Sequence, residues 1–92
     1  MSAFIIVSLT PRDPEKLKAY SAAAGGTVQQ HSGKFVAHGP VEILTGQMHQ
    51  KMQAVIEFPS REEALKWYQS AEYQSLIPLR DEAMDCDFTL IG

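Results

Sequence analysis

A short apolar run near the start of the chain, AFIIVSL at residues 3–9, constrains the fold more than any other feature. Its β-branched and apolar residues predict a strand. Successive side chains of a strand point to opposite faces, so Ile5 and Val7 oppose Phe4 and Ile6. Both faces of this strand are apolar, and both must therefore be covered from water.

The next segment has the sequence signals of a helix. Asp13 can cap it, and Pro14 suits the first helical position, where its missing N–H needs no partner. Apolar residues recur at helical spacing across residues 17–24. The pair Gly25-Gly26 is expected to end or weaken this helix, since glycine costs roughly 1 kcal/mol relative to alanine in a helix interior.

A strand-to-helix unit dominates the second half of the chain. Residues 52–58 predict a strand, and Ser60 with Glu63 three residues later forms a capping box that opens a helix. This helix is expected to reach about residue 70, and a further helical segment at 72–82 to be kinked or restarted near Pro78. The other patterns predict a strand at 34–38, an extended continuation at 41–44 beyond Gly39-Pro40, a polar loop at 46–51 and a last strand at 85–91. Because proline cannot donate in the ladder, the strand before it is expected to be bent, bulged or at an edge.

The predicted order of elements is β-α-β-β-α-β. This order is that of the α+β ferredoxin-like fold, an antiparallel four-stranded sheet with helices on one face. The 92 residues make a single domain, residues 1–92. The helices cover only one face of the sheet, so we expect a second copy of the chain to cover the other in a symmetric homodimer.

Composition excludes several classes of function. The net charge is −3 and the basic residues form no cluster, so nucleic-acid binding is not expected. The apolar runs are far shorter than the roughly 20 residues that cross a bilayer, and the start of the chain lacks a secretion signal. The single cysteine, Cys86, cannot form an internal disulfide, and a buried, inert thiol in a cytoplasmic protein is the expectation.

Several motifs together resemble a known bacterial family, domain of unknown function 1330 (DUF1330), within the dimeric α/β-barrel superfamily. The resemblance spans nearly the whole chain. It rests on Phe4-Ile5-Ile6-Val7, Asp13-Pro14 with Tyr20, Gly33-Lys34-Phe35, Val41-Glu42-Ile43-Leu44 with Gly46, Glu57-Phe58-Pro59-Ser60, Ala64 with Trp67-Tyr68, and Ser70 through Tyr73 to Arg80. It implies a face-to-face dimer whose two sheets form a barrel-like core, and it implies no agreed activity. Superfamily relatives include cofactor-free monooxygenases, haem-degrading enzymes, muconolactone isomerase-like proteins and amino-acid-sensing modules, and fold analogy alone does not choose among them.

Two residues are candidates for catalysis. His38 is a candidate for acid–base work because imidazole is the usual group for it, and it lies on a predicted strand beside the Gly39-Pro40 break. A partly exposed or hydrogen-bonded histidine with a structural role is the simpler alternative. Glu57 lies in an apolar run, where burial would perturb its pKa and allow it to act as a base. Arg80 could pair with Glu57 in a structural ion pair or bind a substrate carboxylate through two hydrogen bonds.

The candidate ligand-binding residues are aromatic, together with the arginine: Tyr20, Trp67, Tyr68, Tyr73 and Arg80. Packing is the alternative role for each aromatic ring. Trp67 and Tyr68 point about 100° apart on a helix, so only one can face the core squarely. We expect a cleft between sheet and helices, lined by Tyr20, His38, Glu57, Trp67 and Arg80, that binds an aromatic or small carboxylic metabolite.

Three functional interpretations follow. The first is a ligand-binding homodimer, which as an enzyme suits proton transfer, isomerisation or cofactor-free oxidation. The second is a non-catalytic dimeric binding or regulatory module. The third, a haem- or metal-dependent enzyme, has less support because His31, His38 and His49 show no close-spaced ligand pair. The sequence contains no glycine-rich phosphate loop and no nucleophile elbow, so we expect neither a cofactor nor a metal site.

Overall fold

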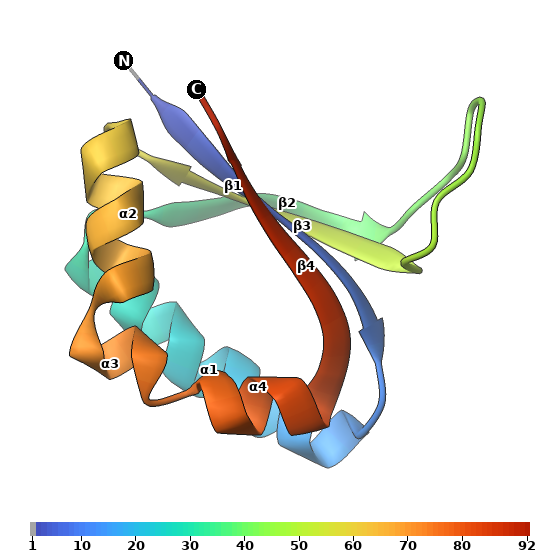
Figure 1. Cartoon of the computed structure of the whole chain (residues 1–92), viewed down its shortest axis with the longest axis horizontal. Coiled ribbons are helices and arrows are strands. Elements are labelled where there is room, and N and C mark those ends of the chain that lie inside the picture. The colour runs from blue at the N-terminus through green and yellow to red at the C-terminus, as the bar shows by residue number, and fades with distance from the viewer. Residues whose placement is uncertain (1) are drawn as a thin grey trace.

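A computed structural model describes residues 2–92 of the chain. The elements in chain order are β1 (Ala3–Pro11), α1 (Pro14–Gln30), β2 (Lys34–Pro40), β3 (Met52–Phe58), α2 (Arg61–Gln69), α3 (Ala71–Gln74), α4 (Ile77–Ala83) and β4 (Met84–Ile91). The strands form one sheet in the order β2-β3-β1-β4, and all neighbouring strands are antiparallel. The helices lie on one side of this sheet (Figure 1). The predicted α+β ferredoxin-like fold is confirmed.

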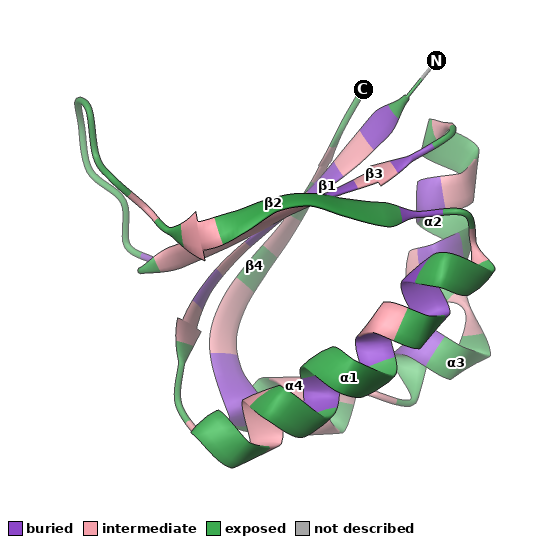
Figure 2. Cartoon of the chain, turned by 180° about the vertical axis from the view of Figure 1, so that it is seen from behind, coloured by how far each residue is buried: buried purple, intermediate pink, exposed green. Residues whose placement is uncertain are grey.

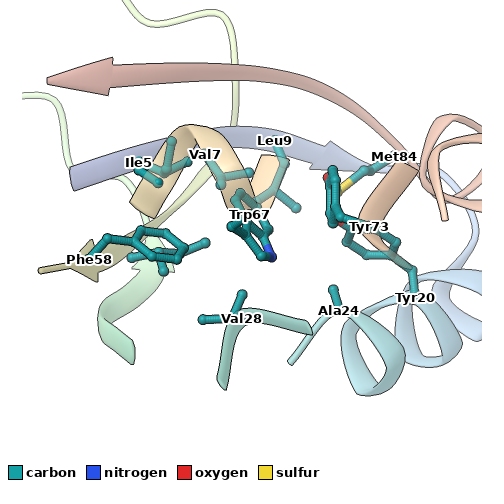
Figure 3. Close-up of a cluster of buried hydrophobic side chains, with 12 residues drawn as sticks. Ile5, Val7, Leu9, Tyr20, Ala24, Val28, Phe58, Trp67, Tyr73 and Met84 are labelled. Atoms are coloured by element: carbon teal, nitrogen blue, oxygen red, sulfur yellow. The ribbon is translucent and has the colours of Figure 1, made fainter. Parts of the chain in front are cut away.

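The central strand β1 shows why the chain folds in two layers. Its alternate residues Ala3, Ile5, Val7 and Leu9 are between 0% and 9% exposed and face the helices. The residues between them are only half-buried. Figure 2 shows the same alternation as purple and pink bands along β1. The helix-facing side therefore holds the core, and its largest fully buried side chains are Trp67, Tyr73, Phe58 and Val28 (Figure 3).

Helix α1 begins as predicted but continues beyond the glycine pair. Asp13 Oδ1 accepts hydrogen bonds from the backbone N–H groups of Glu15 and Lys16, at 3.1 and 3.2 Å. Of the two expectations for Gly25-Gly26, that the pair ends the helix is wrong, since α1 runs on to Gln30; that it weakens the helix stays a prediction. The reason is tertiary packing, because buried side chains on both sides of the pair hold this turn against the core.

The end of α1 is fixed by its connection to β2. Ser32 has a φ of 62°, in the left-handed region that commonly terminates helices, and the N–H of Gly33 donates to the carbonyl of Val28 at 2.9 Å. Gly33 is itself packed tightly, since a Cβ there would lie 2.6 Å from Phe58. Glycine at position 33 is therefore required by space.

The connection between β2 and β3 differs from the predicted one. The strand ends at Pro40, and residues 41–44 are not a strand. Beyond Pro40 one hydrogen bond, from the N–H of Val41 to the carbonyl of Lys51, prolongs the pairing. The loop then projects away from the sheet (Figure 1) and leaves Leu44 88% exposed. As expected from Pro40, β2 is an edge strand, and its register shifts between Phe35 and Ala37.

The second sheet face, which we call the rear face, turns away from the helices. Ile6 of β1 pairs with Val55 of β3, which pairs with Ala37 of β2, and cross-strand partners point to the same side. Phe4 and Ile91 pair with each other on this same face. The rear face therefore carries a half-exposed apolar strip across all four strands. Separately, no helix within residues 2–92 is long and apolar enough to cross a membrane.

Candidate functional site

A cavity of about 320 Å³ lies between the sheet and α1. Val7, Leu9 and Ile56 of the sheet contribute to one side of it, and Leu17 and Ala24 of α1 contribute to the other. The space exists because α1 packs mainly against α4, whereas α2 packs against β1. The helix layer is therefore in closer contact with the sheet at α2 than at α1.

The lining of the cavity is largely apolar, with a few polar groups. Phe35 and His38 on β2 and Ser21 on α1 are exposed lining residues, so this side of the cavity meets solvent. His38 pairs with Ala54 in the sheet, which places its side chain on the same face as the cavity. Of the two predicted catalytic residues, His38 is thus the one in contact with the cavity.

Trp67 forms part of the cavity wall on the α2 side. Its side chain is 1% exposed, and its indole Nε1 donates to Thr27 Oγ1 at 3.0 Å. Thr27 in turn donates to the carbonyl of Ala24 at 2.7 Å. The polar edge of the indole is thereby satisfied by α1. These contacts link α2 to α1 and hold the aromatic ring in place.

Beside the cavity, three tyrosines and an arginine form a hydrogen-bonded cluster. Arg80 Nη1 donates to the hydroxyls of Tyr68 and Tyr73, at 3.1 and 3.2 Å. The hydroxyl oxygens of Tyr73 and Tyr20 lie 2.7 Å apart. The Arg80 guanidinium also lies over the ring of Phe88, 5.0 Å from its centroid, in a cation–π contact. The predicted ligand-binding residues are therefore brought together, but Arg80 already has partners of its own.

Burial determines the protonation state of this cluster. Desolvation raises the pKa of Tyr20, and the neighbouring Tyr73 adds to the effect. Desolvation also raises the pKa of Tyr73, against the opposing effect of its hydrogen bonds with Tyr20 and Arg80. Both hydroxyls are therefore neutral at physiological pH, and the guanidinium is always charged. The tyrosines can donate or accept hydrogen bonds but cannot act as bases.

Glu57 lies on the rear face, away from the cavity. Its Cα partner in β1 is Phe4, and its Oε1 is 3.5 Å from Lys34 Nζ. A hydrogen bond with Ser2, and after it the charge of Lys34, lower the pKa of Glu57. The predicted pairing of Glu57 with Arg80 is wrong, and so is its predicted place in the cleft lining. The physical reason is the strand period, which turns Glu57 away from its buried neighbours Ile56 and Phe58.

Phe88 and Thr27 belong to the site but were not among the predicted site residues. Strand alternation placed Phe88 on one face with Cys86 and Leu90, which is the signal that could have found it. Nothing local indicates that Thr27 receives the indole N–H, because its partner is 40 positions away. Cys86 is half-buried on the helix-facing side, and desolvation raises the pKa of its thiol.

The histidines lie apart from one another. His49 is on the β2–β3 loop, where its Nε2 is 3.3 Å from Asp85 Oδ2 at the surface. His38 is at the cavity, and His31 caps α1. Within the part of the chain that the structure describes, no three metal-ligating side chains come together.

Fold and cavity define an α+β ferredoxin-like protein with an interior space beneath its first helix. The chain belongs to the family described as domain of unknown function (DUF1330), whose model matches residues 2–92. A comparison with proteins of curated function finds no match.

Solved structures share the fold at low sequence identity. A protein of unknown function from Rhodopseudomonas palustris is 18% identical, with a TM-score of 0.80 over 98% of this chain and 80% of that one. A dimeric ferredoxin-like protein of unknown function from Jannaschia sp. CCS1 is 12% identical, with a TM-score of 0.76 over 100% and 99%. SnoaB, a cofactor-independent oxygenase from Streptomyces nogalater, is 9% identical, with a TM-score of 0.73 over 99% and 91%.

Proposed function

We propose that this protein is a cytoplasmic homodimer that binds an aromatic small molecule in the cavity beneath α1. The observation that carries the proposal is the cavity itself. Its volume of about 320 Å³ falls within the range of roughly 300–1,000 Å³ that is usual for small-molecule sites. A largely apolar lining with a few polar groups is also usual for such sites.

The charge of the cavity lining favours an uncharged aromatic ligand over a carboxylate. No lysine or arginine lines the cavity within residues 2–92. Arg80, the expected partner for a carboxylate, instead donates to Tyr68 and Tyr73 and contacts Asp81 Oδ1 at 3.1 Å. A carboxylate in the cavity would lose its hydration without gaining a cation, which is costly. An uncharged aromatic ring loses little hydration energy when it enters the cavity, and it packs against Trp67 and Phe88.

The apolar strip of the rear face supports the homodimer. Phe4, Ile6 and Val55 are half-buried in the single chain, and Ile91 is 55% exposed. A second copy related by a two-fold axis presents the same apolar strip, so each copy covers the strip of the other. The Jannaschia protein, similar in fold over its whole length, is dimeric by its description. The single free cysteine and the absence of a disulfide fit a reducing cytoplasm.

A second candidate function is cofactor-free oxidation of the bound aromatic molecule by O₂. His38 at the cavity could take a proton from an activated ring CH₂ group, and O₂ would oxidise the resulting carbanion to a carbonyl with release of water. The similarity in fold to SnoaB favours this candidate over other reactions. It predicts that oxygen uptake falls in His38→Asn while ligand affinity is kept. Binding without oxygen uptake would instead indicate a non-catalytic module.

Binding can be tested with naphthol and naphthoate, which share a ring system and differ in charge. Calorimetry should show that naphthol binds more tightly than naphthoate, and naphthol should raise the melting temperature because it binds the native state. Ala54→Leu fills the cavity and should abolish both effects. Ala23→Leu, the same change at an exposed position of α1, is the control and should leave them intact. If naphthol binds neither the wild-type protein nor the Ala23→Leu control, the proposal is wrong.

A further inference from the structure

One end of the cavity meets a chain of three hydrogen-bonding groups. Arg80 Nη1 lies 3.2 Å from the Tyr73 hydroxyl, and the Tyr73 hydroxyl lies 2.7 Å from that of Tyr20. Tyr73 is completely buried, whereas Tyr20 lines the cavity. Figure 3 shows the two rings side by side, Tyr20 coming from α1. The chain therefore runs from a cation, through a buried hydroxyl, to the hydroxyl of a residue that lines the cavity.

The donors and acceptors in this chain have one consistent direction. A guanidinium has only donors, so the oxygen of Tyr73 accepts from Arg80. The single hydroxyl proton of Tyr73 needs an acceptor because it is buried, and the oxygen of Tyr20 lies at hydrogen-bond distance. With the opposite direction, the proton of Tyr73 would have no acceptor among the described residues, and a buried donor would be left without a partner.

The hydroxyl proton of Tyr20 then has no acceptor within this chain of hydrogen bonds. A ligand in the cavity that Tyr20 lines can supply one. We propose that Arg80 and Tyr73 orient the hydroxyl of Tyr20 so that it donates to a carbonyl oxygen of the aromatic ligand. This inference rests on the proposed function and names the polar group that the ligand carries. Tyr20 is a binding residue in this arrangement, and Tyr73 and Arg80 are positioning residues.

The charge of Arg80 strengthens the donor. Hydrogen bonds in series polarise one another, so a cation at one end makes the last O–H of the chain a better donor. The Arg80 side chain is only 12% exposed, which limits screening of its charge by water. Burial keeps Tyr20 in its neutral form, as its raised pKa shows. The end of the cavity next to Tyr20 therefore favours an uncharged oxygen with a partial negative charge.

A matched pair of probes tests this inference. α-Tetralone and tetralin differ only by a carbonyl in place of a methylene group. The wild-type dimer should bind α-tetralone more tightly by roughly threefold to tenfold, the usual net effect of one hydrogen bond. In Tyr20→Phe α-tetralone should lose this advantage and bind no more tightly than tetralin, because its buried carbonyl has no donor, while the affinity for tetralin is unchanged. The infrared carbonyl band of bound α-tetralone reports the hydrogen bond directly and should lie at lower wavenumber in the wild type than in Tyr20→Phe.

The positioning residues have a separate readout in the same band. In Tyr73→Phe the carbonyl band should lie between those of the wild type and Tyr20→Phe, because Tyr20 keeps its proton but loses its donor. Tyr68→Phe is the control. It also removes a hydroxyl that accepts a hydrogen bond from Arg80, but this hydroxyl is not part of the chain that leads to Tyr20. It should leave the band where it is in the wild type.

Each result decides one of the two proposals. Equal affinities for the two probes and an unshifted carbonyl band in the wild type would overturn the role of Tyr20 while leaving the binding site itself intact. Failure of both probes to bind would overturn the proposed function, and the assignment of Tyr20 with it. The wild-type infrared measurement requires no variant, so the test does not depend on how well Tyr20→Phe folds.

Discussion

His38 and Glu57 lie on adjacent strands but on opposite faces of the sheet. His38 pairs with Ala54 of β3 and faces the cavity, whereas Glu57 pairs with Lys34 of β2 and faces away from the helices. The two residues cannot act on one bound molecule in a single chain. Acid–base chemistry in the cavity would therefore depend on His38. Glu57 can act only on the rear face.

Glu57→Gln should alter the acid stability of the protein and leave ligand binding unchanged. The pKa of Glu57 is lowered from 4.5 in the folded state by Ser2 and then Lys34. Its contribution to stability is thus fully present above pH 4.5 and is lost as the pH falls through the lower folded value. Urea unfolding at fixed protein concentration should show a smaller loss of stability below pH 4.5 in the variant. An identical pH profile would contradict this assignment.

Replacing Gly25 or Gly26 by alanine should stabilise the protein. Both lie inside α1, and a Cβ at either position would meet no atom within 4 Å. Alanine should therefore add about 0.5–1 kcal/mol per site by lowering the entropy lost on folding. Thermal and denaturant unfolding measure this effect. Gly33→Ala is the contrast and should destabilise, because its Cβ would lie 2.6 Å from Phe58 and 2.8 Å from Val28.

High pH should unfold the protein through Tyr20 and Tyr73. Burial raises the pKa of both from the ordinary value of 10.0, so the folded state favours their neutral forms. Their contribution to stability is fully present below pH 10 and is lost as the pH rises above it. Phenolate absorbance from these two residues should appear together with loss of the native circular dichroism. Tyr20→Phe should make stability less dependent on pH above 10, and phenolate formation by Tyr20 in the native state would argue against the effect.

Most of the fold could be predicted because its signals are local or periodic. Asp13 and Ser60 cap their helices as expected, and the alternation in β1 separates a core face from a rear face. Gly25-Gly26 does not end α1, and residues 41–44 do not continue β2. The first outcome is decided by tertiary packing, and the second by how far β2 pairs with β3. Such information is not contained in a local sequence pattern.

The sequence could predict which aromatic residues lie near Arg80, but not how they are arranged. Tyr68, Tyr73 and Arg80 lie within one short helical region, so their convergence follows from proximity along the chain. Glu57 was placed in the cleft because its neighbours are apolar, although the alternation of Ile56, Glu57 and Phe58 already turns it to the other face. The engagement of Arg80 by tyrosine hydroxyls depends on contacts between elements, which sequence spacing does not reveal.

The indole of Trp67 and the hydroxyl of Thr27 should contribute jointly to stability. Thr27→Val removes the acceptor of the indole N–H and leaves a buried donor unpaired, at a cost of about 1–3 kcal/mol. Trp67→Phe removes the donor and also leaves space in the core. In the double variant the effects should be less than additive, because the second change no longer breaks the hydrogen bond. Strict additivity in denaturant unfolding would show that this bond contributes nothing.

Val55→Lys should dissociate the proposed homodimer. Val55 lies in the apolar strip of the rear face, between Ile6 and Ala37. In a two-fold symmetric interface each substitution occurs twice, so two ammonium groups would be buried without a partner. The dissociation constant should rise by about 100-fold or more, as sedimentation measures it. Leu65→Lys, at a residue 41% exposed on α2, is the matched control and should leave the assembly unchanged. A wild-type protein that sediments as a monomer at all concentrations, with Val55→Lys equally stable, would show that the rear face is not an interface between two copies.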